Sequence, residues 1–129
     1  MQWTPEPGAG FTRPGVEPWL PFGDVERYNV VRQRSDPGSV LNLTRDLIAL
    51  RTSTPLGRGA YRTVSCRDGV WVWQRGDDLL VAANLTPDRG DVPVQDVEVL
   101  IGTTRERDGS RVRGTLRLEP WEGLVLASR

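Results

Sequence analysis

The feature that most limits the fold is a change of hydrophobic period in the second half of the chain. Beyond "LGRGA", apolar and polar residues alternate through short segments, which are separated by the turn signals "RDG", "RGD" and "ERDGS". The predicted strands are Tyr61 to Cys66, Val70 to Arg75, Asp78 to Leu85, Val92–Val94, Val97–Ile101, Val112–Leu118 and Gly123–Ala127. Seven or so short strands predict a mainly β fold, an antiparallel β-sandwich or barrel.

An amphipathic helix is predicted before the strands, in "SDPGSVLNLTRDLIALRTSTP". Ser35 or Asp36 can cap it, Pro37 suits the first helical position, and Pro55 ends it. One face of this helix carries Val40, Leu41, Thr44, Leu47, Ile48 and Arg51, widened by Leu43 and Leu50. This stripe predicts that one broad face of the helix is buried.

Residues 1 to 35 read as a long irregular loop, with the turn clusters "TPEPGAG", "TRPG" and "EPWLPFGD". Aromatic residues are spaced between the turns at Trp3, Phe11, Trp19 and Phe22. A loop of this length is usually functional or packed against another structure, and the aromatics favour packing. "GAGF" lacks the flanking strand and helix of a phosphate-binding loop, so it is interpreted as loop only.

Composition excludes several classes of protein. All 17 basic residues are arginine and they balance 17 acidic residues, so no charge imbalance points to nucleic acid or to an anionic membrane. No apolar run approaches the ~20 residues that span a bilayer, and no signal peptide pattern precedes the loop. The single Cys66 cannot form an internal disulfide, which favours a reducing compartment and predicts a cytoplasmic protein.

The residue types limit the available chemistry as well. Without histidine and with one cysteine, imidazole catalysis, histidine metal sites and cysteine-cluster zinc sites are excluded, and no metal or cofactor is expected. Cys66 is predicted to be a small buried hydrophobe in its strand. The aspartates lie mostly beside glycines or in loops, where turn formation explains them better than a pair of catalytic carboxylates.

The tryptophans are the remaining candidates for a binding surface. Trp71 and Trp73 are two residues apart in one strand and therefore point to the same side. Because both faces of this strand are apolar, a core position between sheets is favoured. The alternative is an exposed sugar platform formed by Trp71, Trp73 or Trp121.

An ordered series of motifs resembles the α-glucosidase branch of glycoside hydrolase family 13. The blocks are "MQW", "AGFT", "PWLP", "NV", "DPGSVLNLTRDLIALR", "GAY", "VWVWQR", "LLVAANLT" and "GTLRLEPWEGLVL". The resemblance implies that residues 1–55 form the end of a (β/α)8 barrel, with its last loop and last helix (residues 36–54). It further implies that residues 56–129 form the C-terminal antiparallel β-sandwich.

The same resemblance places the family's catalytic carboxylates in barrel segments that this chain lacks, so no catalytic residue is assigned. It implies that Gln2, Trp3 and Phe11 lie near substrate, at the rim of the active site. Thr4 stands where the family usually has Asp, which leaves specificity open, and Leu43-Thr44 replaces the usual Phe-Tyr.

The expected function is that of a non-catalytic C-terminal portion of an α-glucosidase-like enzyme, which stabilises a catalytic barrel acting on α-glucosides. Met1 would then be an interior residue of the parent enzyme. As an isolated molecule the chain should expose apolar surface and self-associate or bind a partner. The alternatives are a stand-alone carbohydrate-binding module and an interaction protein that completes a barrel in trans.

Overall fold

The computed structural model describes residues 2–128; Met1 of the "MQW" block and Arg129 at the end of the predicted sandwich lie outside them. The chain forms two compact units, Met1–Asp46 and Leu47–Arg129. These units group residues by their contacts within this chain. The division into a barrel end (1–55) and a sandwich (56–129) therefore stays a prediction.

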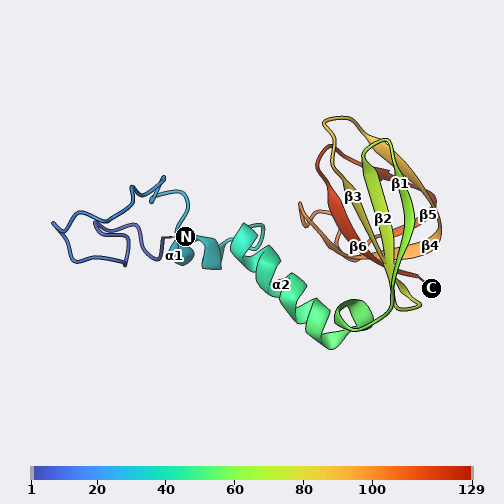
Figure 1. Cartoon of the computed structure of the whole chain (residues 1–129), viewed down its shortest axis with the longest axis horizontal. Coiled ribbons are helices and arrows are strands. Elements are labelled where there is room, and N and C mark those ends of the chain that lie inside the picture. The colour runs from blue at the N-terminus through green and yellow to red at the C-terminus, as the bar shows by residue number, and fades with distance from the viewer. Residues whose placement is uncertain (1, 129) are drawn as a thin grey trace. The chain divides into compact units, whose positions relative to one another are not determined.

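The second unit contains a six-stranded antiparallel sheet, which confirms the predicted mainly β fold (Figure 1). The strands are β1 (Tyr61–Arg67), β2 (Val70–Arg75), β3 (Leu79–Asn84), β4 (Gly90–Gly102), β5 (Arg111–Leu118) and β6 (Gly123–Ser128). Their order in the sheet is β1-β2-β3-β6-β4-β5. The sheet curves over on itself so that β4 and β5 lie behind β1 and β2, as in a sandwich (Figure 1).

The hairpin turns form where the glycines were found in the sequence. Between β1 and β2, Asp68 and Gly69 have φ of 50° and 74°, the left-handed pair that a two-residue hairpin requires. Gly69 is further restricted because an added Cβ would overlap the methyl group of Thr86. Gly109, in the β4–β5 turn, has φ of 78°.

The predicted strands Val92–Val94 and Val97–Ile101 are wrong as separate elements, because both belong to β4. An irregularity in the register between Val94 and Asp96 bends this strand without ending it. Strand β4 pairs with β5 from Gly90 to Glu98, on both sides of the bend, and with β6 from Val97 to Gly102. One bent strand thus joins the two layers.

The hydrophobic core lies between the folded halves of the sheet. It is built from Val70, Val72, Ala82, Val92, Val97, Val99, Leu116, Leu118, Leu124 and Leu126. Leu116, Leu118, Leu126 and Val99 are completely inaccessible to solvent. At about 25 cal/mol per Å² of apolar surface removed from water, this cluster is the main stabilising element of the unit.

The helical region differs from the prediction in two respects. A short helix, α1 (Val30–Ser35), lies inside the predicted loop and is capped by Asn29, whose side chain accepts from the Arg32 N–H at 2.8 Å. The main helix, α2 (Val40–Ser53), begins later than predicted, with Ser39 rather than Ser35 or Asp36 at its cap. Asp36 instead closes a turn with Ser39, whose N–H donates to its carbonyl at 3.0 Å.

Helix α2 buries none of its residues, although its stripe predicts a buried face. Val40 is 69% exposed and Ile48 is 58% exposed. After Ser53 the chain leaves the helix through the short 3-10 turn η1 (Pro55–Gly57), as Pro55 predicts. Within residues 2–128, no helix is long and apolar enough to cross a membrane.

Candidate functional site

Gln2 and Trp3 are fixed to the start of helix α1 by backbone hydrogen bonds. Gln2 forms a parallel bridge with Asn29, and the N–H groups of Val30 and Val31 donate to the carbonyls of Gln2 and Trp3 at 2.9 and 3.2 Å. The two side chains nevertheless line different hollows. Gln2 and Trp3, two of the three predicted substrate-proximal residues, therefore belong to two different surfaces.

Gln2 and Phe11 come together in one hollow, of about 430 Å³. The other residues that line it are Thr12, Pro18, Trp19, Leu20, Pro21 and Phe22. The rings of Phe11 and Phe22 stack with centroids 5.9 Å apart. In the amide orientation that satisfies both partners, Gln2 donates to the Tyr28 carbonyl at 2.7 Å and accepts from the Gly23 N–H at 3.1 Å.

This hollow is mainly apolar, and its aromatic residues face solvent. Trp19 is 95% exposed, Leu20 66% and Phe11 56%. The Gln2 amide is already engaged by backbone groups, so it acts as a support for the loop. We name this hollow the loop pocket.

Trp3 lies outside the loop pocket, in a second hollow with Val30, Arg34, Leu41 and Arg45. Gly10 packs directly against it: an added Cβ would lie 2.7 Å from the Trp3 Cβ, and Gly10 has φ of 77°. The glycines of "GAGF" thus serve loop packing. Of the three predicted residues, the structure brings together Gln2 and Phe11 and separates Trp3.

One carboxylate of the same loop, Glu6, has a shifted pKa. Glu6, in the same loop, accepts a hydrogen bond from the Thr4 side chain, and this bond lowers the pKa of the Glu6 carboxyl. A carboxyl group with a lowered pKa stays ionised and is a poor general acid. Thr4 therefore has a local role in this chain, in holding the loop.

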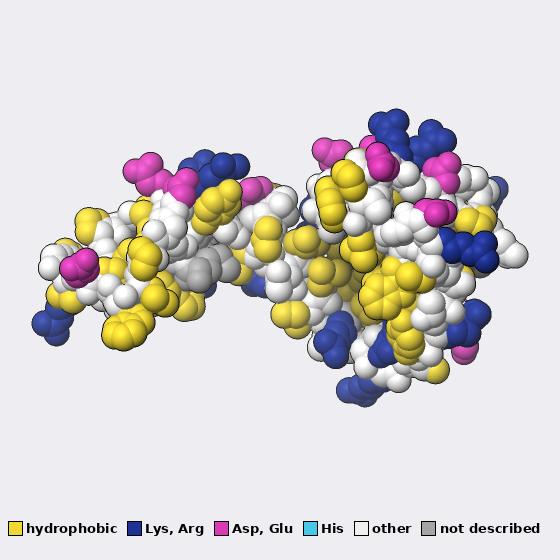
Figure 2. Space-filling view, turned by 45° about the horizontal axis from the view of Figure 1, so that its top comes forward, with side chains coloured by type: hydrophobic (Ala, Val, Ile, Leu, Met, Phe, Trp, Pro, Cys, Tyr) yellow, Lys and Arg dark blue, Asp and Glu magenta, His cyan; other side chains and the backbone are white. Residues whose placement is uncertain are grey.

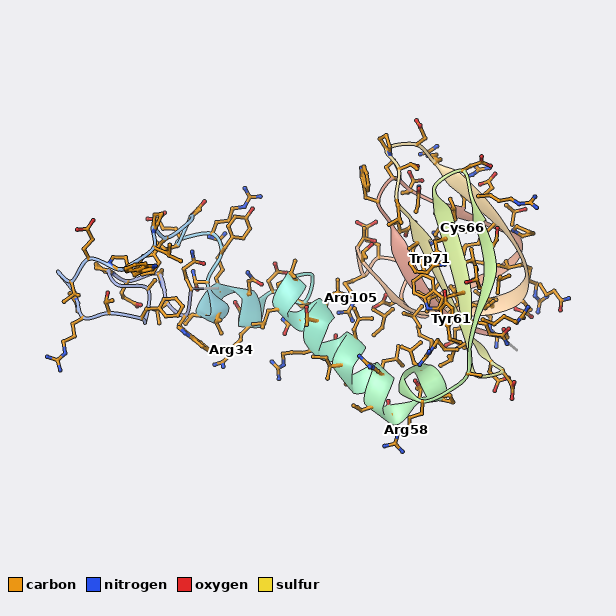
Figure 3. The ribbon with its side chains drawn as sticks, in the orientation of Figure 1. Arg34, Arg58, Tyr61, Cys66, Trp71 and Arg105 are labelled. Carbon is orange, nitrogen blue, oxygen red and sulfur yellow. The ribbon has the colours of Figure 1, made fainter. Side chains whose placement is uncertain are left out.

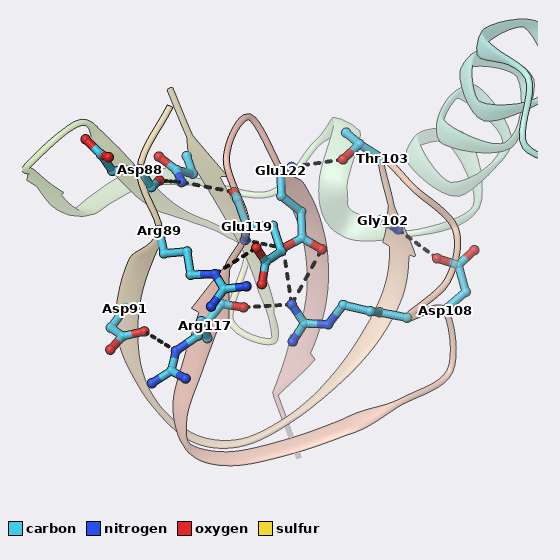
Figure 4. Close-up of polar contacts among 12 residues, drawn as sticks. Asp88, Arg89, Asp91, Gly102, Thr103, Asp108, Arg117, Glu119 and Glu122 are labelled. Atoms are coloured by element: carbon cyan, nitrogen blue, oxygen red, sulfur yellow. Dashed lines mark hydrogen bonds and ion pairs between the residues drawn. The ribbon is translucent and has the colours of Figure 1, made fainter. Parts of the chain in front are cut away.

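The loop end of the sandwich carries a network of ion pairs (Figure 4). Glu122, only 3% exposed, accepts from Arg107 at 3.2 Å and from the Glu119 N–H at 2.9 Å. The Glu119 side chain pairs in turn with Arg89 at 2.9 Å. The buried Glu122 is thereby fully engaged in holding the turn before β6.

The predicted core position of Trp71 and Trp73 is wrong, because the opposite face of β2 holds the core. Val70 and Val72 are 7% and 3% exposed, whereas Trp71 is 38% exposed. The two indole rings contact each other, with centroids 4.7 Å apart. Trp73 also lines a hollow of about 420 Å³ with Leu47, Arg51 and Leu56, among others.

Cys66 is exposed and free, which corrects the prediction that it is buried. It lies in β1, which is an edge strand with no buried residue. Figure 3 shows Cys66 beside Trp71 on the neighbouring strand, and the two are register partners. The sequence could not reveal this, because it does not tell which strand of a sheet lies at its edge.

A groove of about 830 Å³ runs between β1 and the first part of β4. Its floor includes Val70, Val72 and Leu126, which are all at most 7% exposed and so offer little further burial to a ligand. Along the two sides of the groove, Pro93 in β4 and the irregularity in β1 between Thr63 and Ser65 hinder pairing with an added strand. The groove is therefore a poor candidate for a site.

Comparison with known proteins gives matches among solved structures only. No protein-family model and no curated protein matches the chain. The trehalulose synthase MutB from Pseudomonas mesoacidophila MX-45 matches with a TM-score of 0.84 and 26% identity over 98% of this chain. A MutB variant in complex with Tris gives 0.84 and 27%, and a variant in complex with its substrate sucrose gives 0.83 and 27%, each also over 98% of this chain.

Each match covers 24% of the MutB chain, so this chain spans about a quarter of the length of the enzymes it matches. MutB belongs to the α-amylase family, glycoside hydrolase family 13. The predicted resemblance to the C-terminal region of that family is thus confirmed. The α-glucosidase specificity is not supported, since the matched enzymes are trehalulose synthases.

Proposed function

We propose that this chain is the C-terminal region of a family 13 glycoside hydrolase and that it stabilises the catalytic barrel of that enzyme. The observation that carries this proposal is the match over 98% of the chain to one quarter of an enzyme. A match of this kind extends through the loop and α2 as well as through the sandwich. The part of the enzyme that matches this chain therefore includes the loop and the helix as well as the sheet domain.

Exposed apolar side chains support a stabilising role. Trp3, Trp19, Val40 and Ile48 are each more than half exposed, and hydrophobic side chains gather at the surface of both units (Figure 2). Large exposed apolar patches usually mark a surface that another protein segment covers. We assign the stripe of α2 and the second hollow, which Trp3 lines, to contact with the barrel.

We further propose that the loop pocket lies at the rim of the parent active site, with Gln2 and Phe11 close to substrate. Phe11 offers an exposed ring there, and Gln2 orders the loop. Trp3 has a packing role instead, because it faces Leu41 of α2. The substrate class is an α-glucosidic oligosaccharide, a proposal that rests on the family alone, and a cytoplasmic location stays a prediction from the single Cys66.

Two measurements test this proposal. The purified chain should not hydrolyse p-nitrophenyl α-glucoside, because the family resemblance places the catalytic carboxylates in barrel segments outside this sequence; measured turnover would contradict a non-catalytic role. The DNA next to the coding region should encode the strands and helices of a (β/α)8 barrel. When the two products are made together, they should co-purify as one complex with glycosidase or transglycosylase activity, and failure to associate would exclude the stabilising role.

A further inference from the structure

Trp121 has an unusual backbone conformation, with φ of 59°. It is the third residue of the turn Glu119–Glu122, whose last N–H donates to its first carbonyl at 3.2 Å. Pro120 in second position and a positive φ in third position are features of a type II turn, where glycine or asparagine is usual. A bulky side chain at this position carries conformational strain.

Hydrogen bonds to two neighbouring residues keep the turn in this strained state. The Trp121 N–H donates to the Thr86 carbonyl at 3.2 Å. Asn84, only 1% exposed, donates from its backbone to the Glu122 carbonyl at 2.8 Å and from its side chain to the Glu119 carbonyl at 2.9 Å. Because both ends of the turn are bonded to one buried residue, the backbone of Trp121 is held in place.

Burial of the ring within this chain compensates little of the strain, because Trp121 is 64% exposed. Leu85, next to the Thr86 that holds the turn, is also 57% exposed. Strained residues that the surrounding structure holds in place tend to occur at functional sites. Trp121, with its strained backbone and its exposed indole, is such a case.

The first residue of the same turn, Glu119, forms an ion pair with Arg89. The Arg89 Nε donates to the Glu119 carboxylate at 2.9 Å, and their side chains are 66% and 53% exposed (Figure 4). This pair presents both donors and acceptors to solvent. An exposed indole in a turn that also carries a hydrogen-bonding charged group suits a ligand with one apolar side and a hydroxylated edge.

We propose that Trp121 forms a sugar-binding surface, where a pyranose ring of an oligosaccharide stacks on the indole. Ring hydroxyl groups of the sugar bond with Arg89 and Glu119. The choice of a saccharide as ligand rests on the proposed function, because an enzyme of this family works among saccharides. Trp71 and Trp73 are less suited, since their rings contact each other.

The test uses the whole chain labelled with nitrogen-15. Its five tryptophans give five indole N–H signals, and the variant Trp121→Gly identifies one of them by its loss. Glycine adopts a positive φ freely, so this variant should keep the fold, which the remaining amide spectrum will show. A Trp121→Asn variant provides a second removal of the ring at a position that asparagine tolerates.

Titration with maltose should shift the Trp121 indole signal saturably, whereas the acyclic polyol sorbitol should not. Saturation-transfer signals from maltose should disappear in both Trp121 variants and persist in the matched control Trp71→Phe. The proposal is overturned if the Trp121 indole signal does not shift on addition of maltose, or if Trp121→Gly binds maltose as well as the unchanged chain does. A signal that moves with protein concentration only also overturns it, because Trp121 would then be a contact between copies. The catalytic-barrel assay is separate, so failure here leaves the proposed function intact.

Discussion

Replacement of Leu126 by alanine tests the assignment of the core most directly. Leu126 lies in β6 between β3 and β4, opposite Leu80 and Val99, and its side chain is completely buried. Loss of three carbon atoms removes about 2.4 kcal/mol of transfer free energy at ~0.8 kcal/mol per carbon. The cavity left behind adds to this, so the free energy of unfolding should fall by about 3–5 kcal/mol.

Such a loss is a large part of the roughly 5–15 kcal/mol that stabilises a domain. Urea unfolding followed by circular dichroism should show a strongly lowered midpoint, or no folded baseline at all. The matched control is Val64→Ala in the edge strand β1, where the side chain is 47% exposed and the loss should stay below about 1 kcal/mol. Equal losses for the two variants would refute the core described above.

Three further predictions concern the turns, helix α2 and the first unit. Gly69→Ala should lower the free energy of unfolding by more than about 1 kcal/mol, because alanine is strained at φ of 74° and its Cβ would overlap Thr86; urea unfolding checks it, and an unchanged midpoint would contradict the turn geometry. Ile48→Glu should change the free energy of unfolding by less than about 1 kcal/mol, since Ile48 is 58% exposed, and it should reduce self-association in sedimentation velocity. Amides of residues 4–28 should exchange within minutes while those of β6 stay protected, as hydrogen exchange with mass spectrometry can show; equal protection would count against the division of the chain.

The sheet could largely be predicted because its information is local. The turn signals around Asp68, Gly76 and Gly109 have a direct geometric meaning, and positive φ values occur at all three positions. The strand β2 has the predicted bounds Val70–Arg75. A bend within a strand has no such local signature, and for that reason β4 was predicted as two strands.

It was harder to predict which face of each strand points to the core. In "VWVW" both alternating sets are apolar, so the period does not tell which set points to the core. The smaller valines fill the space between the two halves of the sheet, while the tryptophans pack on the outside. Cys66 shows the same limit, because its exposure depends on β1 being an edge strand.

Helix boundaries depended on competing caps. Asp36, Pro37 and Ser39 are all good residues for a helix start, and the outcome is a turn followed by the helix. Gly38 favours the turn, since its N–H donates to the Asp36 carboxylate at 2.9 Å. The Asn29 cap of α1 was missed because the surrounding prolines and glycines indicated a loop.

The exposed aromatic residues of the first unit and Trp121 of the second unit differ in how contacts within this chain hold them. In the described part of the unit Met1–Asp46, the buried apolar residues are Ala9 and Val30, and the exposed ones include Trp3, Trp19 and Phe11. The burial of two apolar residues cannot offset the conformational entropy that is lost when a long loop becomes ordered. This unit therefore needs a further surface to cover it. The strained turn at Trp121 needs no such cover, because hydrogen bonds within the sandwich hold it. The exposed aromatics of the two units therefore differ in their support: those of the first unit lie in a loop with few buried residues, whereas Trp121 lies in a turn that hydrogen bonds hold.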